Sequence, residues 1–469
     1  MNQQIYQDQE IHEECGVFGV FNVDKASELT YYALHAMQHR GQEGCGIVST
    51  DGEKLYGHRG MGLVKETFHE QELRACKGNV AIGHVRYSTA GGSGPNNVQP
   101  FMFNHSTGDF GLCHNGNIVN SKQIREKLER NGSIFQSTSD TEILAHLVKK
   151  NATRSRLESI KEALNILIGG FAFLIITKDK LYAMRDKNGL RPLSIGKLQD
   201  GYVISSETCA FDVIGAEFIR DVLPGEIVTF SKNKVSSCFY TEDTCSKICA
   251  MEYIYFSRPD SDICGINVHA SRKMAGKVLA QEAPVDADIV IGVPDSSLSA
   301  AVGYAEESGI PYEVGLIKNK YMGRTFIEPS QELRDKGVRM KLSPVRSIVK
   351  GKRIILIDDS IVRGTTSTKI VKMLRDMGAS EVHMRIASPP MISPCFYGVD
   401  TSTYDELISA FHNVEEVRKI TGCDSLAFIS MEGLKRAIGL NDMCMACFSG
   451  NYPTELFDSI KDANKETKF

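Results

Sequence analysis

The stretch IILIDDSIVRGTTST, residues 354–368, joins a short apolar strand to a helix through two acidic residues and a turn of small residues. The apolar residues lead into Asp358 and Asp359, and a loop from Arg363 to Ser367 opens the helix. A helix N-terminus offers unpaired backbone N–H groups and the positive end of a dipole, and Gly and hydroxyl residues let a phosphate approach closely. This order of elements predicts that a phosphorylated ligand binds at the carboxyl end of a buried strand.

The acidic pair stands beside the expected phosphate. There, Asp358 and Asp359 are placed to hold ribose hydroxyls or a divalent ion bound to them. The alternative for these two residues alone is a solvated turn with an aspartate-capped helix. A second stretch, IVIGVPDSS at 289–297, has the same order of strand, polar turn and helix, although VPDSS by itself is more often a helix N-cap. The residues therefore indicate a sugar phosphate at the first turn and leave the role of the second open.

The rhythm of the chain changes near its middle. From residue 15 to about 234, short apolar runs are broken by Gly, Asn and Asp, which is typical of strands and hairpins. Helical periodicity interrupts these runs at 29–38, 141–149 and 156–167. We therefore expect an α+β domain, with sheets covered by helices, over residues 15–240.

The rest of the chain alternates apolar strands with long helical segments. ADIVIGVPD precedes a helix expected at 298–308, and RIILIDDS precedes one expected at 365–377. This alternation favours a parallel sheet with helices on its faces. We expect such an α/β domain over residues 248–469. The segment 231–246 is polar and irregular in sequence, and the domain boundary is expected there.

Composition and charge exclude several classes of protein. The formal net charge is -4, whereas proteins that bind nucleic acid or an anionic membrane usually carry an excess of basic residues. Apolar runs such as 171–176 are far shorter than the roughly 20 residues that cross a bilayer, and the polar start of the chain does not resemble a secretory signal. Thirteen cysteines, spread over the chain, favour a reducing compartment. We predict a soluble cytoplasmic protein with no nucleic-acid or membrane partner.

Several motifs of the first half occur in a defined order. They are EECGVFGVF, ALHAMQHRGQEGCGI at 33–47, GHVRYSTAG at 83–91, LCHNGNIVN at 112–120 and STSDTEILAH at 137–146. Taken singly, Cys15 is typical of a buried strand cysteine and Asn115-Gly116 of a hairpin turn. Together the motifs resemble the class II glutamine amidotransferases. The resemblance implies the N-terminal nucleophile hydrolase fold, an αββα sandwich, with Cys15 as the nucleophile.

The chemistry of that family sets a condition on the N-terminus. The nucleophile must be the first residue of the mature chain, because its free α-amine is the base for its own thiol. An α-amine titrates at roughly 7.7 to 8.0 in model peptides, close to working pH. We therefore expect residues 1–14 to be a propeptide that is removed by cleavage between Glu14 and Cys15.

The same resemblance implies how glutamine is bound. Arg86 is expected to bind the α-carboxylate of glutamine through its guanidinium group, and Asp140 the α-ammonium group. Asn115 and the backbone N–H of Gly116 are expected to form the oxyanion hole. His39 and Arg40 are expected to help shape the site without a catalytic role, and His84 and His114 are expected to be structural polar residues.

The second half resembles the type I phosphoribosyltransferases, whose phosphoribosyl pyrophosphate motif has the pattern found at 354–368. The resemblance implies that Asp358 and Asp359 contact the ribose and a magnesium ion. It implies that a loop cradles the 5-phosphate, formed by Arg363, Gly364, Thr365, Thr366 and Ser367. The turn at 294–297 is similar to the family's pyrophosphate loop, which makes Ser296 an expected magnesium contact.

Cys444 and Cys447 form a C-x-x-C pair. On the residues alone, such a pair fits a metal site, a redox pair or two surface thiols of a helix. The resemblance adds two ligands, because the amidotransferases of this group that carry a [4Fe-4S] cluster have cysteines that match Cys249 and Cys395. Thiolates suit zinc and iron–sulfur alike, so spacing does not separate them. We expect a structural [4Fe-4S] cluster without a part in turnover.

The two resemblances together imply one reaction. Ammonia released from glutamine in the first half displaces pyrophosphate from phosphoribosyl pyrophosphate in the second, which yields 5-phosphoribosylamine and begins purine biosynthesis. They also imply a homo-oligomer that purine nucleotides inhibit. A glutaminase serving another synthase would carry an ATP-pyrophosphatase or sugar-isomerase pattern instead, and a non-enzymatic sensor would have lost the acidic pair or the nucleophile. The sequence shows neither feature.

Overall fold

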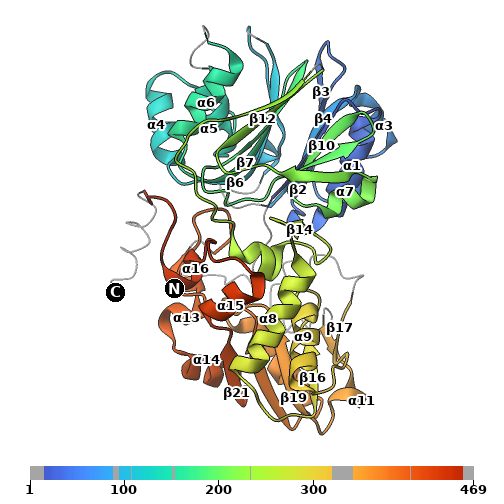
Figure 1. Cartoon of the computed structure of the whole chain (residues 1–469), viewed down its shortest axis with the longest axis vertical. Coiled ribbons are helices and arrows are strands. Elements are labelled where there is room, and N and C mark those ends of the chain that lie inside the picture. The colour runs from blue at the N-terminus through green and yellow to red at the C-terminus, as the bar shows by residue number, and fades with distance from the viewer. Residues whose placement is uncertain are drawn as a thin grey trace, which may run out of the picture.

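A computed structural model of the chain describes residues 15–87, 94–106, 108–149, 154–232, 234–319, 342–401 and 403–457. Figure 1 shows the first half of the chain, coloured blue to green, in the upper part of the molecule, and the second half, yellow to red, in the lower part. The propeptide expected over residues 1–14 lies outside the described residues. The two halves have different architectures.

Within the described residues, the first half contains a seven-stranded antiparallel sheet with the order β11-β9-β10-β1-β4-β2-β3, called here the first sheet. Its strands are β1 (Gly16–Phe21), β2 (Gly44–Thr50), β3 (Leu55–Met61), β4 (Val80–Arg86), β9 (Ser194–Leu198), β10 (Gly201–Ser205) and β11 (Glu217–Asp221). Gly16 pairs with Val85 of β4. The accompanying helices are α1 (Ala26–Ala36), α2 (Val64–Thr67), α3 (Glu70–Ala75) and α7 (Cys209–Ile214). β1 therefore lies in the middle of the sheet, with the expected nucleophile at its start.

The second sheet is antiparallel, and its six described strands follow the order β13-β12-β8-β7-β6-β5. They are β5 (Phe101–Phe103), β6 (Phe110–Ile118), β7 (Gly169–Ile176), β8 (Lys180–Arg185), β12 (Glu226–Ser231) and β13 (Lys234–Phe239). Its helices are α4 (Ser121–Arg130), α5 (Thr141–Lys149) and α6 (Arg156–Ile166). The helix expected at 141–149 thus has the bounds predicted for it.

The packing of these elements forms four layers. Val17 of β1 packs between the two sheets with Leu174 of β7, whereas its neighbour Phe18 packs against Leu34 of α1. On the other side, Phe173 of β7 packs against the helices α5 and α6. This alternation of side chains is what a strand between two apolar layers requires. The expected αββα sandwich is confirmed.

The polar segment 231–246, expected to be irregular, contains the strand β13. Lys234 pairs with Ser231 of β12 and Phe239 with Glu226, so β13 extends the second sheet at its edge. Its alternate side chains are exposed, and its sequence KVSSCF is correspondingly polar. An edge strand with a solvated face carries little apolar signal, which is why its sequence looks irregular.

The second half is built on a parallel sheet, called here the third sheet. Its described strands follow the order β16 (Ile289–Gly292), β19 (Arg353–Asp358), β20 (Glu381–Ile386) and β21 (Ser425–Phe428). Ile355 faces a core with α8 (Val268–Glu282), α9 (Leu298–Ser308) and α15 (Met431–Ile438). Ile354 faces the opposite core, with α12 (Thr365–Asp376) and α14 (Val414–Thr421). Because both faces are covered, the strands are almost wholly apolar, and the predicted α/β architecture is confirmed.

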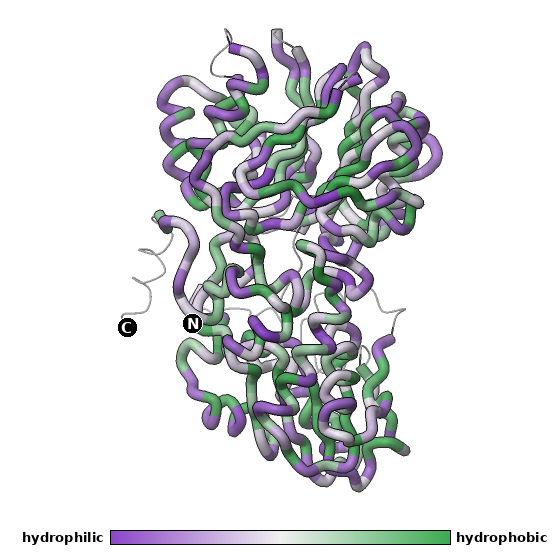
Figure 2. Tube along the Cα trace, viewed as in Figure 1, coloured by the Kyte–Doolittle hydropathy of each residue, from purple (hydrophilic) through white to green (hydrophobic). Residues whose placement is uncertain are grey.

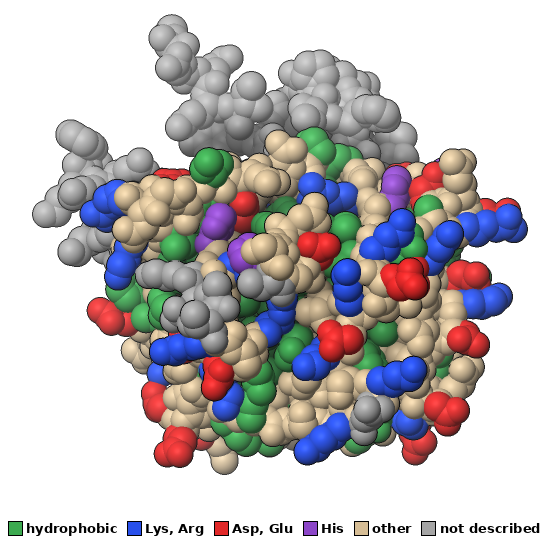
Figure 3. Space-filling view, turned by 90° about the horizontal axis from the view of Figure 1, so that it is seen from above, with side chains coloured by type: hydrophobic (Ala, Val, Ile, Leu, Met, Phe, Trp, Pro, Cys, Tyr) green, Lys and Arg blue, Asp and Glu red, His purple; other side chains and the backbone are tan. Residues whose placement is uncertain are grey.

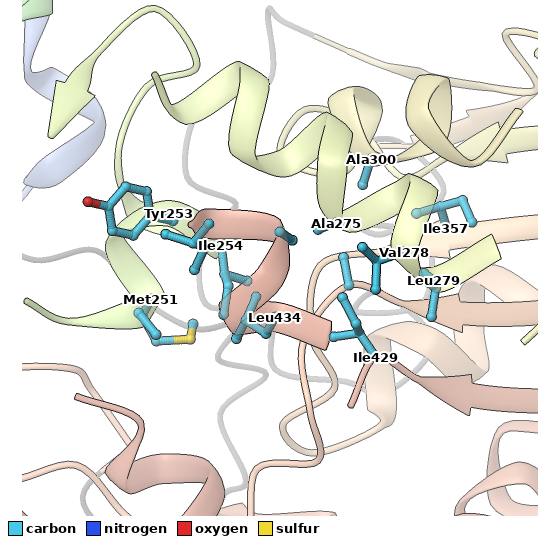
Figure 4. Packing of buried hydrophobic residues seen from close by; sticks show 14 of the residues in the cluster. Met251, Tyr253, Ile254, Ala275, Val278, Leu279, Ala300, Ile357, Ile429 and Leu434 are labelled. Atoms are coloured by element: carbon cyan, nitrogen blue, oxygen red, sulfur yellow. The ribbon is translucent and has the colours of Figure 1, made fainter. Parts of the chain in front are cut away.

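Helices α8 and α9 approach each other closely. A Cβ on Gly276 would lie 1.9 Å from the carbonyl oxygen of Ala300, so the backbone contact requires glycine. Figure 4 shows Val278 and Leu279 of α8 beside Ile429, and Tyr253 and Ile254 near Leu434 of α15. A π-helical turn, Glu252–Phe256, is anchored in this core.

Shorter elements complete the second half. They are β14 (Asp262–Ile263), β15 (Ile266–Asn267), β17 (Leu316–Lys318), β18 (Leu342–Pro344), α11 (Arg346–Val349), α13 (Ile408–Phe411) and α16 (Ala446–Ser449). In Figure 2 hydrophobic segments follow the strands of the sheets, and Figure 3 shows basic and acidic side chains interspersed on the face seen from above. In the part of the chain that the structure describes, every helix is too short or too polar to cross a membrane.

Candidate functional site

Cys15 lies immediately before β1 and is buried. Its Sγ is 3.5 Å from the carbonyl oxygen of Tyr87, which follows β4. Its own carbonyl oxygen accepts a hydrogen bond of 3.1 Å from Nε of Arg40. Since Gly16 pairs with Val85, the start of β1 and the end of β4 lie side by side. The structure therefore brings Cys15 next to Arg86, the last residue of β4.

Arg86 and Asp140, the expected partners of glutamine, are both buried. Arg86 donates through Nη1 to Oε1 of Glu43 at 2.9 Å. Asp140 accepts from the backbone N–H of Ile118 at 2.9 Å and lies 3.7 Å from Nδ1 of His114. Burial raises the pKa of Asp140, but His114 and the backbone N–H groups together bring it below its ordinary value. A carboxylate held in its charged form at this position suits a cationic group.

Asn115 and Gly116 lie on β6 of the second sheet. The Asn115 side chain is fully buried, and its Nδ2 donates to Oγ of Ser206 at 3.5 Å. The same Oγ accepts from the backbone N–H of Val17 at 3.0 Å. Gly116 has a φ of 128°, and a Cβ there would lie 2.0 Å from the carbonyl oxygen of Gly170. Ser206, which the sequence motifs did not indicate, thus links the expected oxyanion hole to the strand of the nucleophile.

A buried group of charges lies behind Cys15. Besides the carbonyl of Cys15, Arg40 contacts Glu207 at 2.7 Å and Glu252 at 2.9 Å, and none of these three side chains is exposed. Glu207 also lies 2.7 Å from Nε2 of His39. Neither glutamate was indicated by the sequence. Each is an isolated acidic residue, and Arg40 is 167 positions from Glu207 and 212 from Glu252.

His84 and His114 are buried in the first half. Nε2 of His84 lies 3.0 Å from the carbonyl oxygen of His114, whose Nδ1 lies 3.2 Å from Oγ1 of Thr141. Burial lowers the pKa of His84 to about 3, so its ring is neutral at pH 7. The two rings connect β4, β6 and the start of α5, which carries Asp140 at its N-terminal side.

The second site lies at the carboxyl edge of the third sheet. Because Gly292 of β16 pairs in parallel with Ile357 of β19, the two polar turns that follow these strands meet. Ser296 Oγ donates to Oδ2 of Asp359, and Ser297 Oγ donates to Oδ1 of Asp358 at 3.3 Å. Both aspartates are largely buried. The structure therefore brings together Ser296, Asp358 and Asp359, the residues expected to hold magnesium.

The loop after β19 leads into α12. Gly364 has a φ of 75° and is the residue before the first turn of α12, which contains Thr365, Thr366 and Ser367. A Cβ on Gly364 would lie 2.8 Å from Cδ1 of Ile408, so this position favours glycine in both space and conformation. The guanidinium of Arg363 pairs with Glu406. Since α12 begins at Thr365, shortly after the acidic pair that ends β19, its unpaired first-turn N–H groups belong to the same end of the third sheet.

A cavity next to the acidic pair extends the second site. Its lining includes Tyr253, Arg272, Ser296 and Asp359. Arg272 is buried and donates to the carbonyl oxygens of Tyr253 at 2.7 Å and Ser257 at 2.8 Å. Burial lowers the pKa of Arg272 to about 10, so it stays cationic at pH 7. Sequence motifs missed this residue, because it lies within α8, away from both turns.

The expected cluster ligands line one cavity between the two halves, together with Arg191 and Tyr397: Cys249, Cys395, Cys444 and Cys447. The backbones of Cys249 and Cys444 form a parallel bridge, and burial raises the pKa of Cys444 to about 12. Among the described residues, no group of three or more His, Cys, Asp or Glu side chains converges on a single metal position. The cavity thus brings the four cysteines around one space, where a bound cation would favour the thiolate form of their side chains.

Comparisons with known proteins define the class. A model of the glutamine amidotransferase domain matches residues 84–213, and a model of the phosphoribosyl transferase domain matches residues 266–387. The chain thus joins a glutamine amidotransferase to a phosphoribosyltransferase. It belongs to the amidophosphoribosyltransferase family, being 57% identical over 464 residues to the amidophosphoribosyltransferase of Bacillus subtilis strain 168, with 97% of this chain and 98% of the relative covered.

Other relatives agree. The amidophosphoribosyltransferase of Staphylococcus aureus strain Mu50 is 54% identical over 456 residues, covering 96% of this chain and 92% of the relative. A solved structure of the allosteric regulatory enzyme of purine biosynthesis has a TM-score of 0.92 at 56% identity and covers 95% of this chain and 97% of its own. The glutamine phosphoribosylpyrophosphate amidotransferase of B. subtilis, complexed with ADP and GMP, has a TM-score of 0.91 at 56% identity, covering 95% of this chain and 98% of its own.

Proposed function

We propose that the protein converts glutamine, water and phosphoribosyl pyrophosphate to 5-phosphoribosylamine, glutamate and pyrophosphate, the first committed step of purine biosynthesis. The observation that carries this proposal is the near full-length identity of 57% to an amidophosphoribosyltransferase. The match of the second half to a phosphoribosyl transferase domain argues against a glutaminase that serves another kind of synthase.

In the first half, we propose that the Cys15 thiolate attacks the side-chain amide of glutamine. The α-amine of a processed Cys15 takes the thiol proton and passes it to the leaving nitrogen, so that ammonia departs and a glutamyl thioester remains for water to hydrolyse. Arg86 and Asp140 bind the α-carboxylate and α-ammonium groups. Asn115 Nδ2 and the Gly116 N–H donate to the oxyanion, a contribution typically worth about 100-fold to 1000-fold in rate per donor.

This chemistry requires processing of the N-terminus. We propose that residues 1–14 form a propeptide and that cleavage after Glu14 frees the α-amine of Cys15. The position of Cys15 supports this proposal, because the residue directly precedes β1 in the middle of the first sheet and is buried beside Arg86. The glutaminase domain then spans residues 15–240.

In the second half, residues 248–469, ammonia attacks C1 of the ribose as the bond from C1 to the pyrophosphate oxygen breaks. We propose that Asp358 and Asp359 bind the ribose hydroxyls, and that the loop from Arg363 to Ser367 binds the 5-phosphate. The proximity of Ser296 to Asp359 supports a magnesium site shared by these residues. Magnesium, when bound, neutralises charge on the departing pyrophosphate. Ammonia escapes protonation only in a passage closed to solvent, so such a passage between the sites is part of the proposal.

The remaining cofactor we propose is a structural [4Fe-4S] cluster. Four cysteines from three separate segments line one cavity, and the segments that carry them contact the first half: Leu190 packs with Tyr397 and Cys444. That these four side chains line the same cavity supports the proposal, because cysteine side chains are the usual ligands of such a cluster. Such a cluster would tie together Cys249, Cys395, Cys444 and Cys447, and thereby the loops that carry them.

Three further proposals concern partners and location. A similar structure is named as a complex with ADP and GMP, which supports inhibition of this enzyme by purine nucleotides. We also propose a homo-oligomer. The cytoplasm is the proposed location, since none of the thirteen cysteines forms a disulfide, as expected in a reducing compartment.

The variant Cys15→Ala tests the division of labour. We expect it to lose glutamine-dependent synthesis while it keeps synthesis from added ammonium, because only the first site needs the thiol. Pyrophosphate release should be measured with each nitrogen donor, together with the N-terminal mass of the unchanged enzyme. Loss of both activities in a folded variant, or an active enzyme with an intact N-terminus, would contradict the proposal.

A further inference from the structure

Glu252 belongs to the second half of the chain, yet its carboxylate is buried against the glutaminase site. It lies in the π-helical turn Glu252–Phe256, three residues after Cys249. Arg40 donates to it twice, through Nη1 at 2.9 Å to Oε2 and through Nη2 at 2.9 Å to Oε1. Such a bidentate pair fixes direction as well as distance. The second half therefore determines how the guanidinium of Arg40 is oriented.

The orientation of Arg40 bears on the nucleophile. With its Nη atoms held by the two carboxylates, Nε of Arg40 points at the carbonyl oxygen of Cys15 and donates to it at 3.1 Å. That carbonyl belongs to the peptide between Cys15 and Gly16, so the hydrogen bond fixes the backbone from which both the α-amine and the thiol project. A loss of this bond would free the backbone of Cys15, just before β1, without touching the groups expected to bind glutamine.

The contacts cross between the halves in both directions. Glu207, from the first half, accepts from Ser261 Oγ at 2.7 Å and from the backbone N–H of Arg258 at 2.9 Å, both in the second half. Glu252, from the second half, lies between Arg40 and Arg191 of the first, with Arg191 Nη1 at 3.6 Å. Arg191 also donates through Nε to the carbonyl oxygen of Tyr397 at 3.0 Å, in the loop of Cys395.

We propose that Glu252 is a positioning residue for glutamine hydrolysis, which acts on Cys15 through Arg40. The inference rests on the proposed glutaminase activity and deepens it, because a residue outside the glutaminase domain sets the geometry of its nucleophile. The two arginines and two glutamates compensate each other in charge, and all four side chains are fully buried. Removing one carboxylate leaves Arg40 with a single acidic partner, toward which its guanidinium turns, away from Cys15.

The expected signature is a selective loss of turnover. A shift of about 1 Å in a reacting group costs up to about 100-fold in rate. Arg86 and Asp140 have partners on other elements, Glu43 and Ile118, so the binding of glutamine should persist. We therefore expect a fall in kcat of the glutaminase with little change in KM, and unchanged synthesis from ammonium.

The experiment compares Glu252→Gln with Glu226→Gln in the processed two-domain enzyme, residues 15–469. Glu226 is an equally buried carboxylate that is bound twice by one arginine, Arg220, at 2.8 and 2.7 Å, and it lies within the first half at β12. For each protein, the measurements are kcat and KM for glutamine hydrolysis, synthesis from ammonium, and the rate at which iodoacetamide alkylates Cys15. We expect Glu252→Gln to lower kcat and the alkylation rate at least about tenfold, with KM within about twofold, and Glu226→Gln to change none of them.

Three results would overturn the inference: an unchanged kcat in Glu252→Gln, an equal loss of the ammonium reaction, or the same loss in Glu226→Gln. If Glu252→Gln fails to fold, Arg40→Lys serves the same purpose, since lysine keeps the charge but cannot bridge both carboxylates and Cys15. The same selective loss of kcat is expected of it, and a normal kcat would be evidence against the proposal. Failure of the wild-type enzyme to hydrolyse glutamine would instead refute the proposed function.

Discussion

In the second half, the residues proposed to bind the sugar phosphate follow one another along the chain, from Asp358 to Ser367. The proposed glutamine site of the first half instead takes Cys15, Arg86 and Asp140 from three separate elements. The supporting contacts differ in the same way. Asp358 and Asp359 accept hydrogen bonds from serines of a neighbouring turn. Arg40, behind Cys15, instead donates to carboxylates that are 167 and 212 positions away in the chain. One strand and the start of one helix suffice to shape the phosphate turn of the second half. The site around Cys15 depends on the packing of both antiparallel sheets and of the other half.

Substitution of the acidic pair, Asp358 and Asp359, has the largest expected effect. It tests directly whether the phosphate turn forms a site from consecutive residues. We expect Asp358→Asn combined with Asp359→Asn to lower synthesis from both glutamine and ammonium by about 1000-fold, because the two charges proposed to hold the ribose and magnesium are lost. Pyrophosphate release with each nitrogen donor is the measurement. Asp286→Asn, at an exposed residue paired with Arg353 in the same half, is the control and should retain activity. If synthesis survives in the double variant, the phosphate turn is not the self-contained site described above.

Gly116→Ala probes the dispersed site through the backbone. The φ of 128° and the carbonyl of Gly170 at 2.0 Å from an added Cβ force β6 to move, so we expect the oxyanion donor to be misplaced. Glutamine-dependent synthesis should fall about 100-fold to 1000-fold, with synthesis from ammonium retained. Gly215→Ala is a matched control, since Gly215 also has a positive φ, of 71°, but open space around it. Equal activity in the two variants would contradict the assigned role.

The contrast also explains what the sequence could and could not predict. The strand-to-helix turn of the second half is contiguous, so its pattern alone indicated a phosphate site, and Thr365 begins α12 as expected. In the first half, the pattern gave strands and helices, with α5 at its predicted bounds, but the roles of Cys15 and Asn115 came only from the resemblance to a family. The sequence did not indicate Glu207 and Glu252. A single glutamate looks like any surface residue until the structure shows the distant arginine that it pairs with.

A third prediction concerns how the stability of the protein changes with pH, which depends on the buried His84 of the first half. Burial lowers the pKa of His84 from 6.5 to about 3. The unfolded chain therefore binds a proton at a higher pH than the folded chain does, and stability falls as the pH drops from about 6.5 to about 3, by up to about 1.4 kcal/mol per pH unit. We expect His84→Gln to show a smaller loss of stability between pH 7 and pH 4 than the unchanged protein, by urea unfolding. Parallel losses in the two proteins would show that His84 takes up a proton in the folded state.

The smallest effects test whether the halves unfold together. Ser155 caps α6 in the first half by accepting from the Glu158 N–H at 3.3 Å, and Asn413 caps α14 in the second by accepting from the Glu416 N–H at 3.0 Å. We expect Ser155→Ala and Asn413→Ala each to lower stability by about 1 kcal/mol. Because both arginine partners of Glu252 come from the other half, separation would leave this carboxylate uncompensated, and calorimetry should show each variant lowering one common transition. Two transitions, with each variant moving only that of its own half, would mean that the buried charges do not join the halves into one cooperative unit.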